Sequence, residues 1–173
     1  MRVLLAESSR GVRDGLRTII NSEAGLEVVG EASDGQAALA AIIRLRPDVV
    51  VVAVDLEGLD GLEVTRRVAG SPASGDPPVP VLVIGGDGLE GLVAAVRAGA
   101  RGYLRRRVVS DGLVAAVRAL GSGGGHLGPA VTRQLLDYAA PRLPLPTPAV
   151  HPGLDELSDR EREVLCLLGR GQT

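Results

Sequence analysis

Short apolar runs alternate with stretches of helical periodicity along most of the chain, and this alternation restricts the fold more than any other feature. The run Val49–Val54 has six consecutive apolar residues, which is typical of a strand that is buried on both faces of a parallel sheet. The pattern predicts an α/β fold with a doubly wound parallel sheet of five strands. The strands are expected at Arg2–Ala6, Leu26–Ala32, Val49–Val54, Val81–Ile84 and Gly102–Leu104.

Helical stretches separate these strands and follow the last one. They are expected at about Ser9–Ser22, Ala37–Leu45, Gly61–Ala69, Leu89–Ala98, Asp111–Leu120 and Pro129–Ala140. Pro47 should end the second helix, because a proline disfavours helical geometry in the residue before it. Ser110 is expected to cap the fifth helix.

Proline-rich sequence after the last of these helices indicates a division of the chain. We expect a domain at 1–121, a connecting helix at 122–140, a linker at 141–156 and the start of a second domain at 157–173. Ser158 and Glu161 form the pattern of a capping box at the start of a helix. A lone amphipathic helix cannot bury its apolar stripe, so this tail should belong to a larger domain or pack on a partner.

Charge and composition exclude several classes of protein. The chain has 19 basic and 21 acidic residues and a net charge of −2, so its overall charge does not indicate a nucleic-acid-binding protein. All of the basic residues are arginines, so chemistry that needs a lysine is excluded. No apolar stretch is long enough to span a membrane, and the N-terminus becomes polar too early for a signal peptide, so we predict a cytoplasmic protein.

Four segments together resemble a known family. In chain order they are RVLLAESSRGVRDGLRTII, EASDGQAALAAIIRLRPDVVVV, GLDGLEVTRRV and RAGARGYLRRR. They resemble the receiver domain of response regulators of the NarL/FixJ group, and LSDREREVLCLLGRGQT resembles the opening helix of a LuxR-type helix-turn-helix domain. The resemblance implies a CheY-like, flavodoxin-like fold. It also implies phosphorylation of an aspartate at the end of the third strand, with Mg²⁺ held by an acidic pair after the first.

The residues at the corresponding positions depart from that chemistry. The acidic pair corresponds to Glu7 and Ser8, the phosphoacceptor to Ala53, the switch Thr/Ser to Gly85, the lysine to Arg106 and the switch aromatic to Tyr103. A methyl group cannot be phosphorylated, so the resemblance implies a degenerate phosphorylation pocket with no catalytic residue and a lost Mg²⁺ site. We expect no cofactor.

Three further expectations concern this pocket. Asp55 would lie one pleat beyond Ala53, roughly 6.5 Å away, and is interpreted as a solvated loop acid rather than an alternative phosphoacceptor. Arg106 should contact Glu7 directly or through water and close the pocket without metal. Gly85 should leave space that could admit a small ligand. The arginines at 101, 105, 106 and 107 are expected to form a solvated rim or a subunit contact.

The function predicted from these features is transcriptional regulation by an atypical response regulator, not catalysis, because no nucleophile–base pair or metal cluster is found. The receiver would serve homodimerisation and sensing, through the face of the fourth helix, fifth strand and fifth helix or through the first and fifth helices. DNA would be bound by the helix-turn-helix domain that begins near Leu157, and we expect no DNA-reading helix within residues 1–173. The alternatives are a sensor of small molecules and an interaction module that pairs with other regulators.

Overall fold

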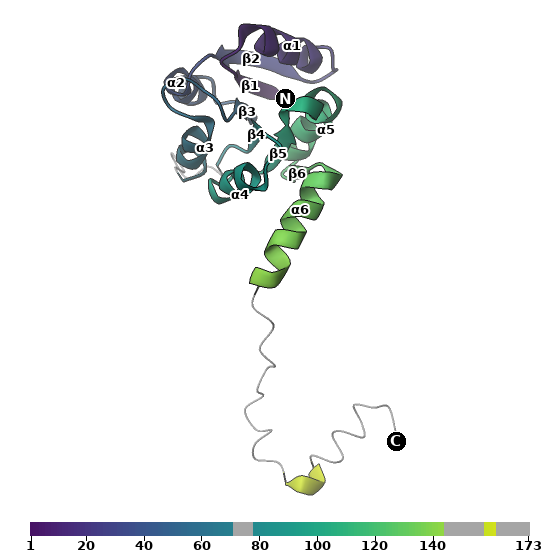
Figure 1. The fold of residues 1–173 in the computed structure, drawn as a ribbon. Helices are drawn as coiled ribbons and strands as arrows, with labels where there is room; N and C mark the ends of the chain where they lie inside the picture. The colour runs from purple at the N-terminus through teal and green to yellow at the C-terminus, as the bar shows by residue number, and fades with distance from the viewer. Residues whose placement is uncertain (71–77, 144–157, 162–173) are drawn as a thin grey trace. The chain divides into compact units, whose positions relative to one another are not determined.

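The computed structural model describes residues 1–70, 78–143 and 158–161 (Figure 1). The chain divides into two compact units, Met1–Ala139 and Ala140–Thr173, and the first contains the whole sheet. Within the described residues, none of the helices combines the length and apolarity needed to cross a membrane.

The first unit is built on a parallel sheet in the order β2-β1-β3-β4-β5-β6. The strands are β1 (Arg2–Ala6), β2 (Glu27–Ala32), β3 (Val49–Ala53), β4 (Val81–Gly85), β5 (Gly102–Arg105) and β6 (His126–Leu127). The predicted α/β fold is confirmed, but the described sheet has six strands rather than five. The additional strand β6 extends the β5 edge and is too short to show any periodicity in the sequence.

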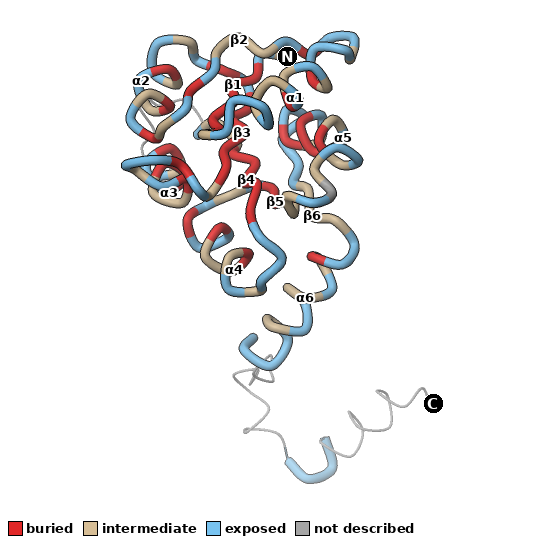
Figure 2. Tube along the Cα trace, turned by 45° about the horizontal axis from the view of Figure 1, so that its top comes forward, coloured by how far each residue is buried: buried red, intermediate tan, exposed pale blue. Residues whose placement is uncertain are grey.

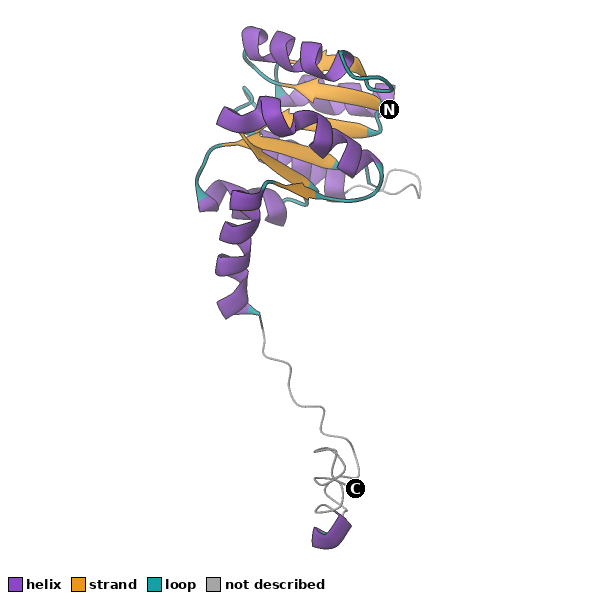
Figure 3. Ribbon diagram, turned by 90° about the vertical axis from the view of Figure 1, so that its right-hand side faces the viewer, coloured by secondary structure: helices purple, strands orange, loops and turns teal. Residues whose placement is uncertain are grey.

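Helices cover both faces of this sheet, as Figure 3 shows. They are α1 (Arg10–Asn21), α2 (Gly35–Leu45), α3 (Gly61–Gly70), α4 (Leu89–Arg97), α5 (Val109–Gly121) and α6 (Pro129–Ala139), with 3-10 turns at Arg106–Val108 and Ala140–Arg142. The second helix ends before Pro47, as predicted. The predicted cap of the fifth helix is wrong, because α5 continues directly from the 3-10 turn and Ser110 lies inside its first turn.

Two apolar clusters form the core on the two faces of the sheet (Figure 2). One joins the strands to α2, α3 and α4 and includes Val131 of α6, and the other joins them to α1 and α5. Every residue of β3 and β4 is buried, because side chains on both faces of these central strands meet helices. The core therefore fixes where each strand ends.

The carboxyl ends of the parallel strands lie at one edge of the sheet, which is where open α/β folds place their functional sites. Glu7 follows β1, Ala53 ends β3, Gly85 ends β4 and Arg106 follows β5. The topology thus brings residues from four distant parts of the chain to the same edge.

The second unit is described only in part. Ser158 N donates to Glu161 Oε2 at 2.8 Å, as expected in a capping box, and residues 159–161 are helical. The hydrogen bonds from Ser158 lower the pKa of the Glu161 carboxyl. Most of the predicted linker, and the predicted tail helix beyond 161, lie outside the described residues.

Candidate functional site

Glu7 is a buried carboxylate at the carboxyl edge of the sheet, with a side chain only 2% exposed. Its Oε1 accepts a hydrogen bond from Ser9 N at 2.9 Å, and its Oε2 accepts one from an Arg106 guanidinium nitrogen at 2.9 Å. A buried charge is costly unless it is paired and hydrogen-bonded, and here both oxygens have a partner. The expected contact between Glu7 and Arg106 is present and direct.

Arg106 bridges two carboxylates. Its second terminal nitrogen lies 3.3 Å from Asp55 Oδ2, so one guanidinium contacts both Glu7 and Asp55. The Arg106 side chain is 37% exposed and that of Asp55 is 80% exposed, so the bridge runs from the interior to solvent. Ser8 Oγ donates to the Asp55 carbonyl at 3.1 Å and adds a second link to the same loop. Asp55 is therefore solvated, as expected, but also ion-paired.

Ala53 is the last residue of β3 and is fully buried. The start of α3 lies directly over it: Gly61 N donates to the Val54 carbonyl at 3.0 Å, and a Cβ atom at Gly61 would lie 2.8 Å from the Ala53 carbonyl carbon. Glycine is required at 61 by this close approach of two backbones. Ala53, which the sequence analysis aligned with the phosphoacceptor, thus places only a methyl group in a packed environment.

Tyr103 occupies the space beside Gly85, which corrects the expected vacancy. A Cβ atom at Gly85 would overlap the Tyr103 hydroxyl and lie 2.8 Å from Cζ of its ring. The Tyr103 hydroxyl donates to the Gly86 carbonyl at 2.8 Å, and the side chain is buried. Burial raises the pKa of the Tyr103 hydroxyl. The missing side chain at Gly85 therefore makes room for an aromatic ring.

The four arginines around β5 do not form a uniformly solvated rim, which corrects that part of the expectation, while a subunit contact stays a prediction. The Arg105 side chain is only 13% exposed and donates to Gln134 Oε1 of α6 at 2.6 Å. Arg105 Nε and Arg107 Nε lie 3.7 Å and 3.1 Å from Asp87 Oδ1. Of the four, Arg101 and Arg107 are exposed. Neither partner was predicted: Gln134 could not be, because the position of α6 was unknown, and no motif marks Asp87.

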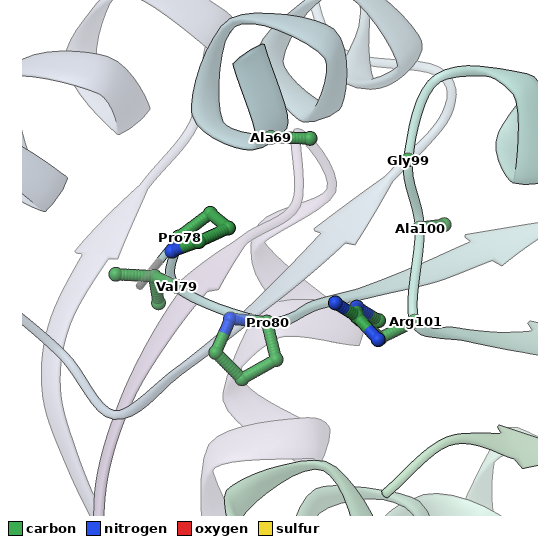
Figure 4. Close-up of a pocket in the computed structure, with 7 residues that line it drawn as sticks. All are labelled: Ala69, Pro78, Val79, Pro80, Gly99, Ala100 and Arg101. Carbon is green, nitrogen blue, oxygen red and sulfur yellow. The ribbon is translucent and has the colours of Figure 1, made fainter. Parts of the chain in front are cut away.

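A separate cavity lies at the opposite, amino edge of the sheet (Figure 4). It has a volume of about 350 Å³ and lies between the end of α3 and the segments that precede β4 and β5. It is lined by Ala69, Pro78, Val79, Pro80, Gly99, Ala100 and Arg101. Because all but one of these residues are small or apolar, this cavity has none of the carboxylate chemistry of the Glu7 edge.

A divalent cation does not fit the donor set at the Glu7 edge. Both oxygens of Glu7 are already engaged, and the nearby acid Asp55 is bound to the same guanidinium. In the part of the chain that the structure describes, no three His, Cys, Asp or Glu residues are grouped so that they could hold a metal ion. Magnesium prefers near-octahedral coordination by oxygen, and a single occupied carboxylate does not offer it.

The order β2-β1-β3-β4-β5, with β6 added at the edge, is the doubly wound order of flavodoxin-like folds, which include receiver domains. The family model of the response regulator receiver domain matches residues 3–118, and the chain belongs to this family. The transcriptional regulatory protein LiaR of Bacillus subtilis strain 168 is 32% identical over 173 residues, covering 100% of this chain and 78% of LiaR. The response regulator UvrY of Escherichia coli strain K12 is 31% identical over 174 residues, covering 99% of this chain and 75% of UvrY.

A solved structure is similar as well. A two-component response regulator of the LuxR family from Aurantimonas sp. SI85-9A1 superposes with a TM-score of 0.72 at 28% identity, covering 80% of this chain and 97% of that one. The similarity between this chain and LuxR-family regulators therefore extends from sequence to structure.

Proposed function

We propose that this chain is a transcriptional regulator whose receiver works without phosphorylation of an aspartate. The regulatory role is supported by similarity to LiaR, which is named a transcriptional regulatory protein, over the whole of this chain. The loss of phosphorylation is supported above all by one observation, the Arg106 guanidinium that bridges Glu7 and Asp55. In the proposal this arginine takes the place of both the metal ion and the phosphoryl-binding lysine.

Charge balance explains why such a pocket is stable without metal. Carboxylates crowded at about 4 Å repel one another by about 4 kcal/mol per pair at an effective dielectric constant near 20, so an intact receiver pocket needs a cation. Here Ser8 and Ala53 are neutral, the positive charge of Arg106 offsets the buried charge of Glu7, and the Asp55 side chain is 80% exposed to solvent. The pocket is proposed to be degenerate at Glu7, Ser8, Ala53, Gly85 and Arg106, with no Mg²⁺ bound.

The output is proposed to be DNA binding by a helix-turn-helix domain that begins around Leu157, Ser158 and Glu161. In such domains the second helix enters the major groove, and dimers match half-sites on the duplex. The receiver would then act as a homodimerisation module that spaces two DNA-binding domains. This part of the proposal is supported by the similarity to UvrY and LiaR rather than by any contact in the described residues.

Treatment with acetyl phosphate and Mg²⁺ tests the proposal directly. We expect intact mass spectrometry to find no addition of a phosphoryl group, while an intact receiver treated in parallel gains one. Asp55→Asn is the matched variant, because Asp55 is the exposed acid nearest to the pocket. A phosphoryl group on the wild-type chain that is absent from Asp55→Asn would show that this acid is phosphorylated and would overturn the proposal.

A titration with Mg²⁺ tests the metal part separately. A ligand that binds only the folded state raises the thermal unfolding temperature. Since the proposal is that Mg²⁺ does not bind, we expect the same unfolding temperature at zero and at millimolar Mg²⁺. Stabilisation of the wild-type chain by millimolar Mg²⁺ that Glu7→Gln abolishes would show that the metal site is retained.

A further inference from the structure

Three consecutive arginines, the last residue of β5 and the first two of the following 3-10 turn, contact three different parts of the molecule. Arg106 contacts Glu7 and Asp55 in the pocket. Its neighbours contact the β4–α4 loop and α6 instead. The segment that positions Arg106 in the pocket therefore also positions two side chains that contact the β4–α4 loop and α6.

The first of these elements is the β4–α4 loop. Asp87 lies within ion-pair distance of both Arg105 and Arg107, at 3.7 Å and 3.1 Å. Tyr103, on the same strand, donates to the carbonyl of Gly86 at 2.8 Å. Two side chains of β5 and one of the 3-10 turn that follows it thus hold this loop.

The second element is α6. Its first turn is anchored by Val131, which is 4% exposed, and by Thr132 Oγ1, which donates to the Leu127 carbonyl at 3.2 Å. Further along, Gln134 accepts the 2.6 Å hydrogen bond from Arg105, which is charge-assisted and largely shielded from solvent. Leu136, two residues later, is 63% exposed. Arg105 therefore holds α6 in its middle, beyond the contacts that anchor its first turn.

We infer that Arg105 couples the Glu7 pocket to α6, as a positioning residue that acts through the backbone it shares with Arg106. Displacement of Arg106 from Glu7 would move the end of β5, and Arg105 would transmit this movement to Gln134 and so to the chain that follows α6. The inference goes beyond the proposed function and does not depend on whether the pocket can be phosphorylated. It assigns to α6 the role of the element that carries changes in the receiver towards residue 140.

Hydrogen exchange of the α6 backbone amides in the full chain tests the first step. A hydrogen bond to a charged group contributes enough to local stability that Arg105→Gln should speed exchange in α6 by about tenfold. Gln134→Leu removes the other partner on a partly exposed face and should give the same result. Arg107→Gln is the matched control, because it also loses a contact to Asp87 but has no partner on α6, and it should leave exchange in α6 within about twofold of wild type.

The two tyrosines of the chain verify that the variants stay folded. One lies in the core and one on α6, so 3-fluorotyrosine gives one ¹⁹F resonance from each region, assigned with Tyr103→Phe and Tyr138→Phe. A Tyr103 resonance in Arg105→Gln that stays single and distinct from that of the unfolded chain shows that the core is intact. Unchanged exchange in α6 in that variant, or equal acceleration in the Arg107→Gln control, would overturn the inference.

A double-variant comparison tests the coupling itself. Arg106→Gln should speed exchange in α6 severalfold when Arg105 is present, and should add nothing in the Arg105→Gln background. If Arg106→Gln leaves α6 unchanged, or if the two effects simply multiply, the pocket and α6 are independent and the inference is wrong.

Discussion

Replacement of Arg106 by glutamine should destabilise the receiver because it leaves a charge buried without its partner. Removing one member of a fully buried ion pair typically costs about 3–5 kcal/mol. The cost here should be lower, because the Arg106 side chain is 37% exposed and water can reach the gap, and because Ser9 N still donates to Glu7. We therefore expect a loss of about 2 kcal/mol in the free energy of unfolding.

A thermodynamic cycle separates the pair interaction from other effects of the change. Glu7→Gln removes the charge but keeps an acceptor, so it should cost less than Arg106→Gln, and the double variant should cost less than the sum of the two. We expect a coupling energy of about 1–2 kcal/mol, measured by urea unfolding followed by far-ultraviolet circular dichroism at pH 7. The coupling should persist in moderate salt, since partly buried pairs are weakly screened.

A surface pair of the same length supplies the control. Arg67 Nε lies 2.9 Å from Glu63 Oε1 on α3, but the carboxylate there is 30% exposed, whereas that of Glu7 is 2% exposed. Arg67→Gln should therefore leave the urea midpoint unchanged within error. A coupling energy for Glu7 and Arg106 that is indistinguishable from zero would refute the view that this pair organises the pocket.

The other predictions concern packing and ionisation. Gly85→Ala should lower the free energy of unfolding by about 1–3 kcal/mol, because the added methyl group would overlap the ring of Tyr103. Gly86→Ala is the control and should be tolerated, because the space around it is open. The urea unfolding midpoints of the two variants test this difference. Burial raises the pKa of the Tyr103 hydroxyl in the folded state. Above about pH 10 the unfolded chain loses this proton while the folded chain keeps it, so the free energy of unfolding should fall as the pH rises from there towards the folded-state pKa. Below about pH 10 it should be unaffected. Tyr103→Phe should abolish that alkaline loss in urea midpoints measured against pH. Ile20→Ala, at a fully buried site, should cost about 2–5 kcal/mol, while Ile43→Ala, at a site 78% exposed, should change the midpoint little.

The strands could be predicted because the sequence marks both their interiors and their ends. The apolar run at Val49 continues into Val54, whereas the ladder ends at Ala53, a difference of one residue at a boundary. The strand β6 gave no such signal, since two residues cannot show a period. The first turn of α5 was mispredicted because the 3-10 turn at Arg106–Val108 runs straight into the helix and leaves no place for a cap at Ser110.

The site was predictable to the extent that topology alone determines it. Parallel strands place Glu7 and Arg106 at one edge, so their contact followed from opposite charge and position. The space at Gly85 was misjudged, because the absence of one side chain says nothing about which neighbour moves into its place. The contact of Arg105 with Gln134 depends on how α6 docks, which neither residue indicates by itself.

The pairing of β6 with β5 has a practical consequence for anyone who trims this protein. A fragment ending at Gly121 would lose His126–Leu127 and leave the outer backbone groups of β5 unpaired, and would also uncover the apolar surface beneath Val131. An exposed edge strand with unpaired backbone groups can pair with strands of other chains, so such a fragment should aggregate. Expression through Ala139 keeps Gly102 and Tyr103 paired with β6 and keeps Val131 in place, and we expect this form to remain monodisperse.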